Sequence, residues 1–140
     1  MKDILAKLKT LIKQGMGEIR AVHVLPDPNF LPASTQFPCV GLLDGDSTFS
    51  EGMDRTEDEK GSVVIYVYVQ ILKVVASVMG DGALKGVLEL AEDLRSLLNW
   101  SSLDGLVQHF YCPQASGSEM MQKDERVFLQ RKGLRFNYIR

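Results

Sequence analysis

The stretch from Gly61 to Val75, GSVVIYVYVQILKVV, constrains the fold more than any other part of the chain. It is strongly apolar and β-branched, and it alternates as a strand does. One side of such a strand carries Val63, Ile65, Val67, Val69 and Ile71, and the other carries Val64, Tyr66, Tyr68, Gln70 and Leu72. Because both sides are mostly apolar, we expect a central strand with helices on one face and a second layer, such as a neighbouring subunit, on the other. Tyr66 and Tyr68 suit that subunit interface, since each joins an aromatic ring to a polar tip.

Size and composition indicate one globular domain spanning residues 1–140. The net charge of -2 predicts neither nucleic-acid recognition nor attraction to a membrane surface. Cys39 and Cys112 are too far apart in sequence for a metal-binding pair, so we expect two reduced thiols near strand ends. Lysines interrupt the apolar residues of the N-terminal segment, and no signal-peptide or transmembrane stretch is expected there. Folding in a reducing cytoplasm follows from these features.

The first part of the chain predicts one helix and two short strands. Met1 to Gln14 has the apolar spacing of an amphipathic helix, and Glu18 to Leu25 alternates as a short strand. Pro26 to Pro38 is rich in proline and is expected to be an extended surface connection. Cys39 to Leu43 predicts a strand that ends in a turn at Asp44-Gly45-Asp46.

An acidic segment then precedes the central strand. Residues 44–60 contain many carboxylates, and Phe49 and Met53 are almost its only apolar side chains. A connection longer than about 12 residues is usually functional or disordered. We therefore expect a mobile acidic loop over residues 44–60.

The second half of the chain predicts a helix and two more strands. Ala83 to Trp100 has the strongest helical periodicity, with Trp100 at the edge of the core, and Leu106 to Cys112 is a candidate strand. Arg126 to Arg140 is either one long strand with a bulge at Gly133 or two strands in a tight hairpin, and the long strand is favoured. The fold class is therefore α+β, with a mixed, mostly antiparallel sheet of four to five strands and two helices packed on one face.

Motifs for catalysis are incomplete. The sequence contains no G-x-S-x-G, H-E-x-x-H or C-x-x-C, and Gly80, Gly82 and Gly86 do not have the spacing of a nucleotide-binding loop. His23 and His109 have no carboxylate or thiol at a helical spacing. We expect no enzymatic activity, catalytic residue, cofactor or metal site.

Charge is distributed unevenly along the chain. The acidic middle contrasts with a lysine-bearing N-terminal helix and a basic C-terminal segment. That segment carries Arg126, Arg131, Lys132, Arg135 and Arg140. The separation favours head-to-tail self-association, in which an acidic loop meets the basic edge of the next copy. On charge alone, ordinary solvated side chains explain the pattern equally well.

Taken together, these features resemble the tail terminator family of long-tailed bacteriophages, the tail-to-head joining proteins that include the lambda tail terminator. The resemblance spans nearly the whole chain in element order and texture: the leading helix, the Pro-rich stretch into Phe37-Pro38-Cys39-Val40-Gly41, and the acidic loop before the long strand. The helix Leu84 to Leu98 and the closing strand from Arg126-Val127-Phe128 to Phe136-Asn137-Tyr138 complete it.

The resemblance implies a virion protein that assembles as a homohexameric ring on the head-proximal end of the tail tube, after a stage in the host cytoplasm. Such a ring stops tube polymerisation and presents a surface to a head completion or connector protein. The implied interface with other subunits or with the tube comprises Phe49, Met53, Asp54, Arg55, Glu57, Tyr66, Tyr68, Arg131, Lys132 and Arg135.

Two alternatives stay open at this point. A head completion or neck adaptor protein shares the size and texture of a tail terminator. A small cytoplasmic enzyme or ligand-binding domain would place its site between the sheet and the Pro-rich connection.

Overall fold

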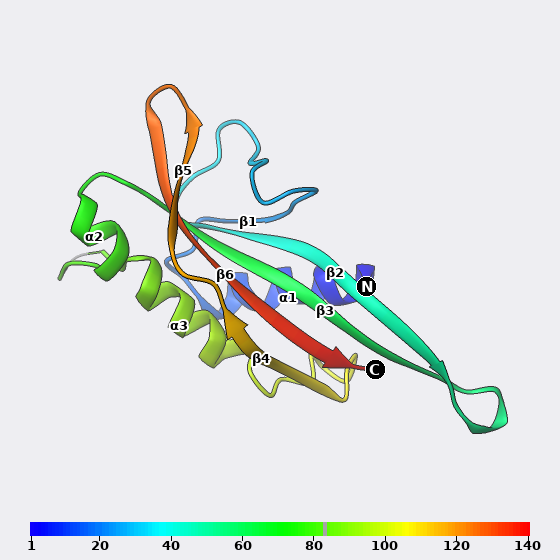
Figure 1. Ribbon diagram of the computed structural model, residues 1–140. Helices are drawn as coiled ribbons and strands as arrows, with labels where there is room; N and C mark the ends of the chain where they lie inside the picture. The colour runs from blue at the N-terminus through cyan, green and yellow to red at the C-terminus, as the bar shows by residue number, and fades with distance from the viewer. Residues whose placement is uncertain (83) are drawn as a thin grey trace.

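The computed structural model describes residues 1–82 and 84–140, and it shows an α+β fold built on a six-stranded mixed sheet (Figure 1). The elements are α1 (Lys2–Gly15), β1 (Ala21–Val24), β2 (Cys39–Glu51), η1 (Met53–Arg55), β3 (Glu57–Gln70), α2 (Val74–Met79), α3 (Val87–Leu98), β4 (His109–Ala115), β5 (Glu119–Asp124) and β6 (Val127–Ile139). The strand order is β1-β2-β3-β6-β4, and β5 also pairs with β6. Among the strand pairs of the described residues, β1–β2 alone is parallel. The expected fold class is confirmed, with more strands and one more short helix than the sequence predicted.

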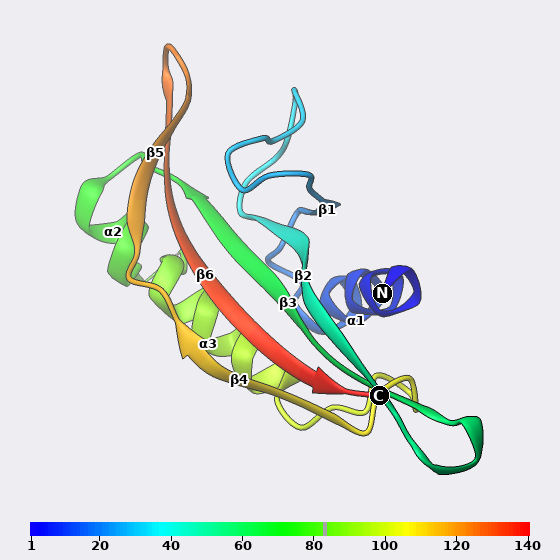
Figure 2. The ribbon, with the colours of Figure 1, turned by 45° about the vertical axis from the view of Figure 1, so that its right-hand side comes forward.

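The helices α1 and α3 cover one face of the sheet (Figure 2). The inward side of β3 supplies the fully buried side chains of Val63, Ile65 and Val67. They pack with an apolar stripe from each helix into one core cluster. The stripes are Ile4, Leu8 and Ile12 of α1, and Val87, Leu90, Ala91, Leu94 and Leu98 of α3. The alternation of the central strand and the helical spacing therefore predicted this layer correctly.

The start of α3 depends on glycine. A Cβ on Gly86 would lie 2.4 Å from both the Gly80 nitrogen and the Val78 carbonyl oxygen, closer than real Cβ atoms approach. Gly86 therefore lets α2 and α3 meet end to end. The expected helix began at Ala83, which lies outside the described residues, and the observed helix begins at Val87.

The second face of the sheet is covered in part by the Pro-rich connection. Tyr68 is fully buried, and its hydroxyl donates a hydrogen bond of 2.6 Å to the Pro28 carbonyl. Around it lies a second cluster containing Leu25, Cys39 and Leu129. The second layer expected over the central strand is thus supplied here by the chain itself, at one end of the sheet.

The acidic segment is not the expected loop. The turn predicted at Asp44-Gly45-Asp46 is a register shift inside β2, and β2 continues to Glu51. It pairs with β3 as far as Glu51 opposite Glu57, and this pairing forms a hairpin that projects past the rest of the sheet (Figure 1). The prediction of a loop was wrong because the outer half of the hairpin buries almost nothing. Its strands therefore lack the apolar alternation by which a strand is recognised in a sequence.

The central strand is shifted relative to its predicted range. It begins at Glu57 and ends at Gln70, and Val74 and Val75 instead open the short helix α2. Gly80 ends α2 with a φ of 82°, a left-handed conformation that favours glycine. The β-branched residues concealed this helix because they have strand propensity.

The C-terminal segment is one long strand, as favoured, but it has no bulge at Gly133. The β3–β6 register runs without interruption through Tyr66 opposite Gly133. The irregularities lie in the partner strands, between Tyr111 and Gln114 of β4 and between Gln122 and Asp124 on β5. Two strands therefore share the outer edge of β6: β5 pairs with its first half and β4 with its second half. The strand β5 was not predicted, because its sequence is polar.

Candidate interaction surfaces

The outer half of the β2–β3 hairpin is the most exposed part of the regular structure. Pairing of β6 with β3 begins at Lys60 opposite Ile139, and backbone hydrogen bonds between Glu59 and Arg140 extend it by one position. Beyond Glu59 the ribbon consists of β2 and β3 alone. An isolated pair of strands is only marginally stable in water. A partner surface would therefore stabilise this part of the chain.

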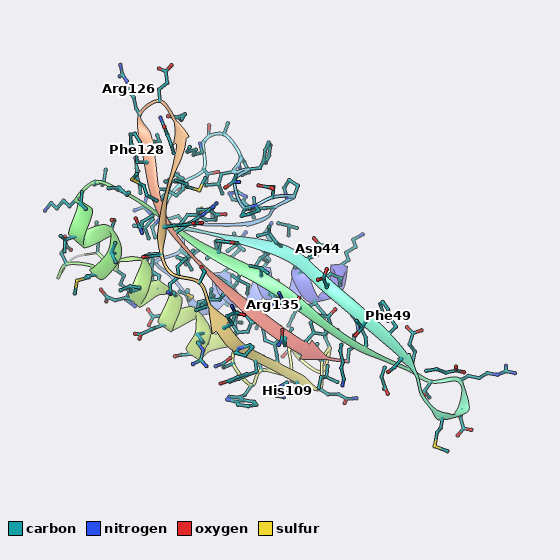
Figure 3. All side chains as sticks on the ribbon, in the orientation of Figure 1. Asp44, Phe49, His109, Arg126, Phe128 and Arg135 are labelled. Carbon is teal, nitrogen blue, oxygen red and sulfur yellow. The ribbon has the colours of Figure 1, made fainter. Side chains whose placement is uncertain are left out.

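The hairpin tip, defined here as residues 48–58, brings together five of the predicted interface residues. Phe49 is 60% exposed and Met53 is 87% exposed. The ionisable side chains of the tip are Glu51, Asp54, Arg55, Glu57 and Asp58, all exposed. The tip is thus a small apolar surface surrounded by net negative charge (Figure 3 shows Phe49 on the outer part of β2).

The turn at the tip is ordered by local hydrogen bonds. The Gly52 amide donates to the Thr56 carbonyl at 2.7 Å, and the Thr56 hydroxyl donates to the Met53 carbonyl at 2.7 Å. Asp54 and Arg55 have φ angles of 58° and 63°, in the left-handed region. Aspartate tolerates that region better than most residues. The tip therefore presents its side chains on a defined turn.

The base of the hairpin is fastened to the last strand. Tyr138 is buried, and its hydroxyl lies 2.7 Å from Glu59 Oε1 and 3.1 Å from Ser47 Oγ. Burial, followed by the hydrogen bond to the Glu59 carboxylate, raises the pKa of Tyr138. At the same end, Arg140 forms a bidentate pair with Asp3 of α1, and this guanidinium is the main reason that the pKa of Asp3 is lowered to about 2. The hairpin thus projects from a firmly held base.

The predicted tyrosines have different environments. Tyr66 is half-buried on the open part of the sheet, beside a hollow of about 150 Å³ that Val64, Gly133 and Arg135 also line. Tyr68 is buried beneath the Pro-rich connection, and burial is the main cause of its raised pKa. Tyr66 is therefore accessible to another molecule, whereas Tyr68 belongs to the core of this chain.

The predicted basic edge is largely engaged within the molecule. The Arg131 guanidinium donates to Glu119 Oε1 at 2.7 Å, to Asn29 Oδ1 at 2.7 Å and to the Pro28 carbonyl at 3.0 Å. The Lys132 amine donates to the Ser116 carbonyl at 2.6 Å. Arg135, in contrast, is exposed and lies on the middle of β6 (Figure 3). Of these three cations, Arg135 is the one whose side chain is exposed.

An exposed apolar group around α2 was missed by the sequence analysis. Its members, between 64% and 76% exposed, are Leu72, Val74, Val75, Met79 and Leu84. Exposed apolar patches often mark interaction sites. The signal was present in the sequence, but assigning Val74 and Val75 to the central strand placed them in the core.

A cleft of about 640 Å³ lies where the second alternative expected a ligand site, next to the Pro-rich connection. Its lining includes Arg20, Phe37, Pro38, Gln70 and Lys85. The Lys85 amine is held by two carboxylates, Glu18 at 2.9 Å and Asp93 at 2.6 Å. These partners raise the pKa of Lys85, and the amine lowers that of Glu18. The cleft therefore has mixed polar and apolar walls.

The histidines and Cys39 have different surroundings in the described residues. His23 lies 3.5 Å from the Thr35 hydroxyl, and His109 packs edge-on against Trp100 with ring centroids 5.2 Å apart. Trp100 is 69% exposed, so its predicted place at the edge of the core is wrong. Burial raises the pKa of the Cys39 thiol to about 12, which leaves the thiol protonated at neutral pH.

The described residues contain neither a metal-binding cluster nor a membrane-spanning helix. No group of three or more His, Cys, Asp or Glu side chains is arranged to hold a metal ion in residues 1–82 and 84–140. None of the helices in the described part of the chain combines the length and apolar character needed to cross a bilayer.

Comparison with known proteins adds no relative: no protein-family model matches the chain, and no curated protein matches it.

Proposed function

We propose that this protein caps the head-proximal end of a bacteriophage tail tube as a hexameric ring, ends tube polymerisation and presents the surface to which the head connector binds. The observation that carries the proposal is the hairpin tip, which projects past the sheet with Phe49 and Met53 exposed. A projecting, marginally stable ribbon with an apolar end is suited to being stabilised by a partner surface. The resemblance in element order to tail terminators is the reason that we propose a tail tube as that partner.

A ring requires two different complementary surfaces on each subunit. A heterologous contact between such surfaces closes when the rotation per step fits. The chain offers the acidic hairpin tip at one end and several distinct exposed groups elsewhere, including Arg135 and the apolar side chains around α2. These surfaces could serve contacts to the next subunit, to the tube and to the head connector.

Electron microscopy tests the proposal. The protein is mixed, in separate samples, with purified tail tubes and with isolated heads of the virion that carries it. Ring-shaped density is expected at one end of each tube. Density on isolated heads in place of tubes would favour the neck adaptor function. Absence of density on both structures would refute a role at either junction.

The 640 Å³ cleft favours a second candidate, a small ligand-binding domain. Pockets of this size are typical of small-molecule sites. A metabolite that binds the native state would raise the melting temperature. A reproducible rise that is lost in Arg20→Ala or Gln70→Ala, both in the cleft lining, would support this candidate over the structural role.

A further inference from the structure

A third hollow of the molecule carries a net positive charge, opposite in sign to the net charge of the hairpin tip. This hollow, called here the α1 groove, has a volume of about 450 Å³ and lies between α1 and the first strands. It is lined by Met1, Lys2, Leu5, Ala6, Lys9, Val24 and Asp44. Val24 is 54% exposed, although it belongs to a strand. Contact of such an apolar floor with water costs free energy, and a partner that covers the floor removes that cost.

The charges around the α1 groove are unpaired within the described chain. Lys2, Lys9 and Asp44 form no hydrogen bond or ion pair through their side chains with another residue in 1–82 or 84–140. Other charged residues nearby are engaged: Asp3 pairs with Arg140, and Lys7 pairs with Asp104. The groove therefore presents two free amines and one free carboxylate around an apolar floor.

The hairpin tip is the complement of this arrangement. It offers exposed apolar side chains, Phe49 and Met53, for the floor. Its carboxylates outnumber its single arginine, so the net negative charge suits Lys2 and Lys9, while Arg55 suits Asp44. Complementary charges of this kind steer encounter and fix the register of an interface.

The tip and the groove of one molecule do not meet. The hairpin extends beyond the end of β6, away from the remainder of the sheet, and its tip is exposed (Figures 1 and 2). The groove of the same molecule is open. A second copy is therefore the occupant that the chain itself supplies.

We propose that the hairpin tip of one copy docks in the α1 groove of the next, with Phe49 and Met53 against Leu5, Ala6 and Val24 and with the tip carboxylates facing Lys2 and Lys9. This inference rests on the proposed function, because it names the contact that would build the ring. The contact joins two different surfaces, so each copy uses its tip once and its groove once. Repetition of the contact closes a ring when the geometry of each step permits.

Cross-linking from the tip tests the contact directly. Met53 is replaced by the photoreactive residue p-benzoylphenylalanine, a change at an 87% exposed position that leaves the core intact. Isotopically light and heavy protein are mixed at high concentration and irradiated, and mass spectrometry locates the adducts between different molecules. The expected adducts lie within residues 1–9 and at Val24. Adducts confined to other regions, or no intermolecular adducts, would overturn the proposal.

A charge variant provides the second measurement. Lys2→Glu with Lys9→Glu makes the groove repel the tip, and we expect the yield of these adducts to fall about tenfold, equivalent to about 1.4 kcal/mol. Lys13→Glu with Arg126→Glu is the matched control, because it changes the net charge equally at two exposed positions that do not line the groove, and the adduct yield should be unchanged. An undiminished yield in the groove variant would also overturn the proposal. If that variant unfolds, the positions of the adducts in the protein with native Lys2 and Lys9 still decide whether the tip docks in the groove.

The two proposals fail separately. Tubes that are capped by a protein with no tip-to-groove adducts contradict the docking contact and leave the capping function standing. Tip-to-groove adducts in a protein that leaves tubes uncapped contradict the capping function and leave the docking contact standing.

Discussion

The Tyr138 hydroxyl lies 2.7 Å from the Glu59 carboxylate and joins the end of the last strand to the base of the projecting hairpin. The same hydroxyl lies 3.1 Å from Ser47 Oγ, so both strands of the hairpin are held by one side chain. Gly61 makes room for it, because a Cβ there would lie 2.4 Å from the tyrosine oxygen. This contact marks the boundary between the supported part of the hairpin and its free outer half.

Removal of that hydroxyl should loosen the hairpin base. Tyr138→Phe loses the hydrogen bonds to Glu59 and Ser47, and we expect the free energy of unfolding to fall by about 1–2 kcal/mol. Hydrogen exchange should quicken at the amides of residues 47–60. Tyr66→Phe is the matched control, since the Tyr66 hydroxyl has no protein partner in the described residues and its loss should change stability by less than about 0.5 kcal/mol. Equal effects of the two substitutions would show that the Tyr138 contact does not fasten the hairpin.

Arg131 should stabilise the Pro-rich connection. Arg131→Ala removes hydrogen bonds to the Pro28 carbonyl and Asn29, together with the Glu119 pair, and we expect a loss of about 2 kcal/mol. Denaturant titration measures this loss, and limited proteolysis should cut residues 26–38 faster. Arg135→Ala, on the same strand but exposed, should have little effect on either measurement. Slow cleavage in both variants would contradict the anchoring role of Arg131.

His23 should make stability depend on pH. Burial, followed by repulsion from Lys9 and Lys13, lowers its pKa in the folded state below the ordinary value of 6.5. The unfolded chain therefore takes up the proton first, and folded stability falls as pH drops through about 6.5. Melting temperatures at pH 7.5 and pH 5.0 should differ more for the native protein than for His23→Gln. Parallel changes in the two proteins would remove His23 as the cause.

Deletion of the hairpin tip should separate folding from function. Removal of Thr48 to Asp58 takes away no residue of either buried cluster. We therefore expect a folded protein, with a melting temperature within a few degrees of native, that no longer binds tubes. Phe49→Ser with Met53→Ser is a milder version that should weaken binding and leave the hairpin backbone in place. Normal capping by the deletion variant would exclude the tip from the function.

The parts of the fold that could be read from the sequence are those that bury a periodic apolar surface. The stripe of Ile4, Leu8 and Ile12 predicted α1, and the alternation of Val63, Ile65 and Val67 predicted the centre of β3. In each case one face packs in the core, so the spacing of apolar residues follows the geometry of the element.

The parts that could not be read are stabilised by pairing alone or by distant contacts. The outer half of β2 and the strand β5 bury little, and their polar sequences look like those of loops. Tyr68 has the same sequence signal as Tyr66, and only the tertiary position of Pro28 decides that it is buried. The engagement of Arg131 could not be predicted either, because its partners Pro28 and Asn29 are more than a hundred positions away in sequence. The exposure of the candidate interface residues was therefore easier to predict on the hairpin tip, where it is set locally, than on the sheet, where Tyr68 is buried.

Tube length is the most direct measure of the proposed capping function. Tail tube protein is allowed to polymerise with and without this protein, and tube lengths are measured by electron microscopy. We expect added protein to arrest growth, to shorten the distribution of tube lengths and to leave a ring on one end of each arrested tube. Tubes that grow to the same length in both samples, with bare ends, would contradict that function.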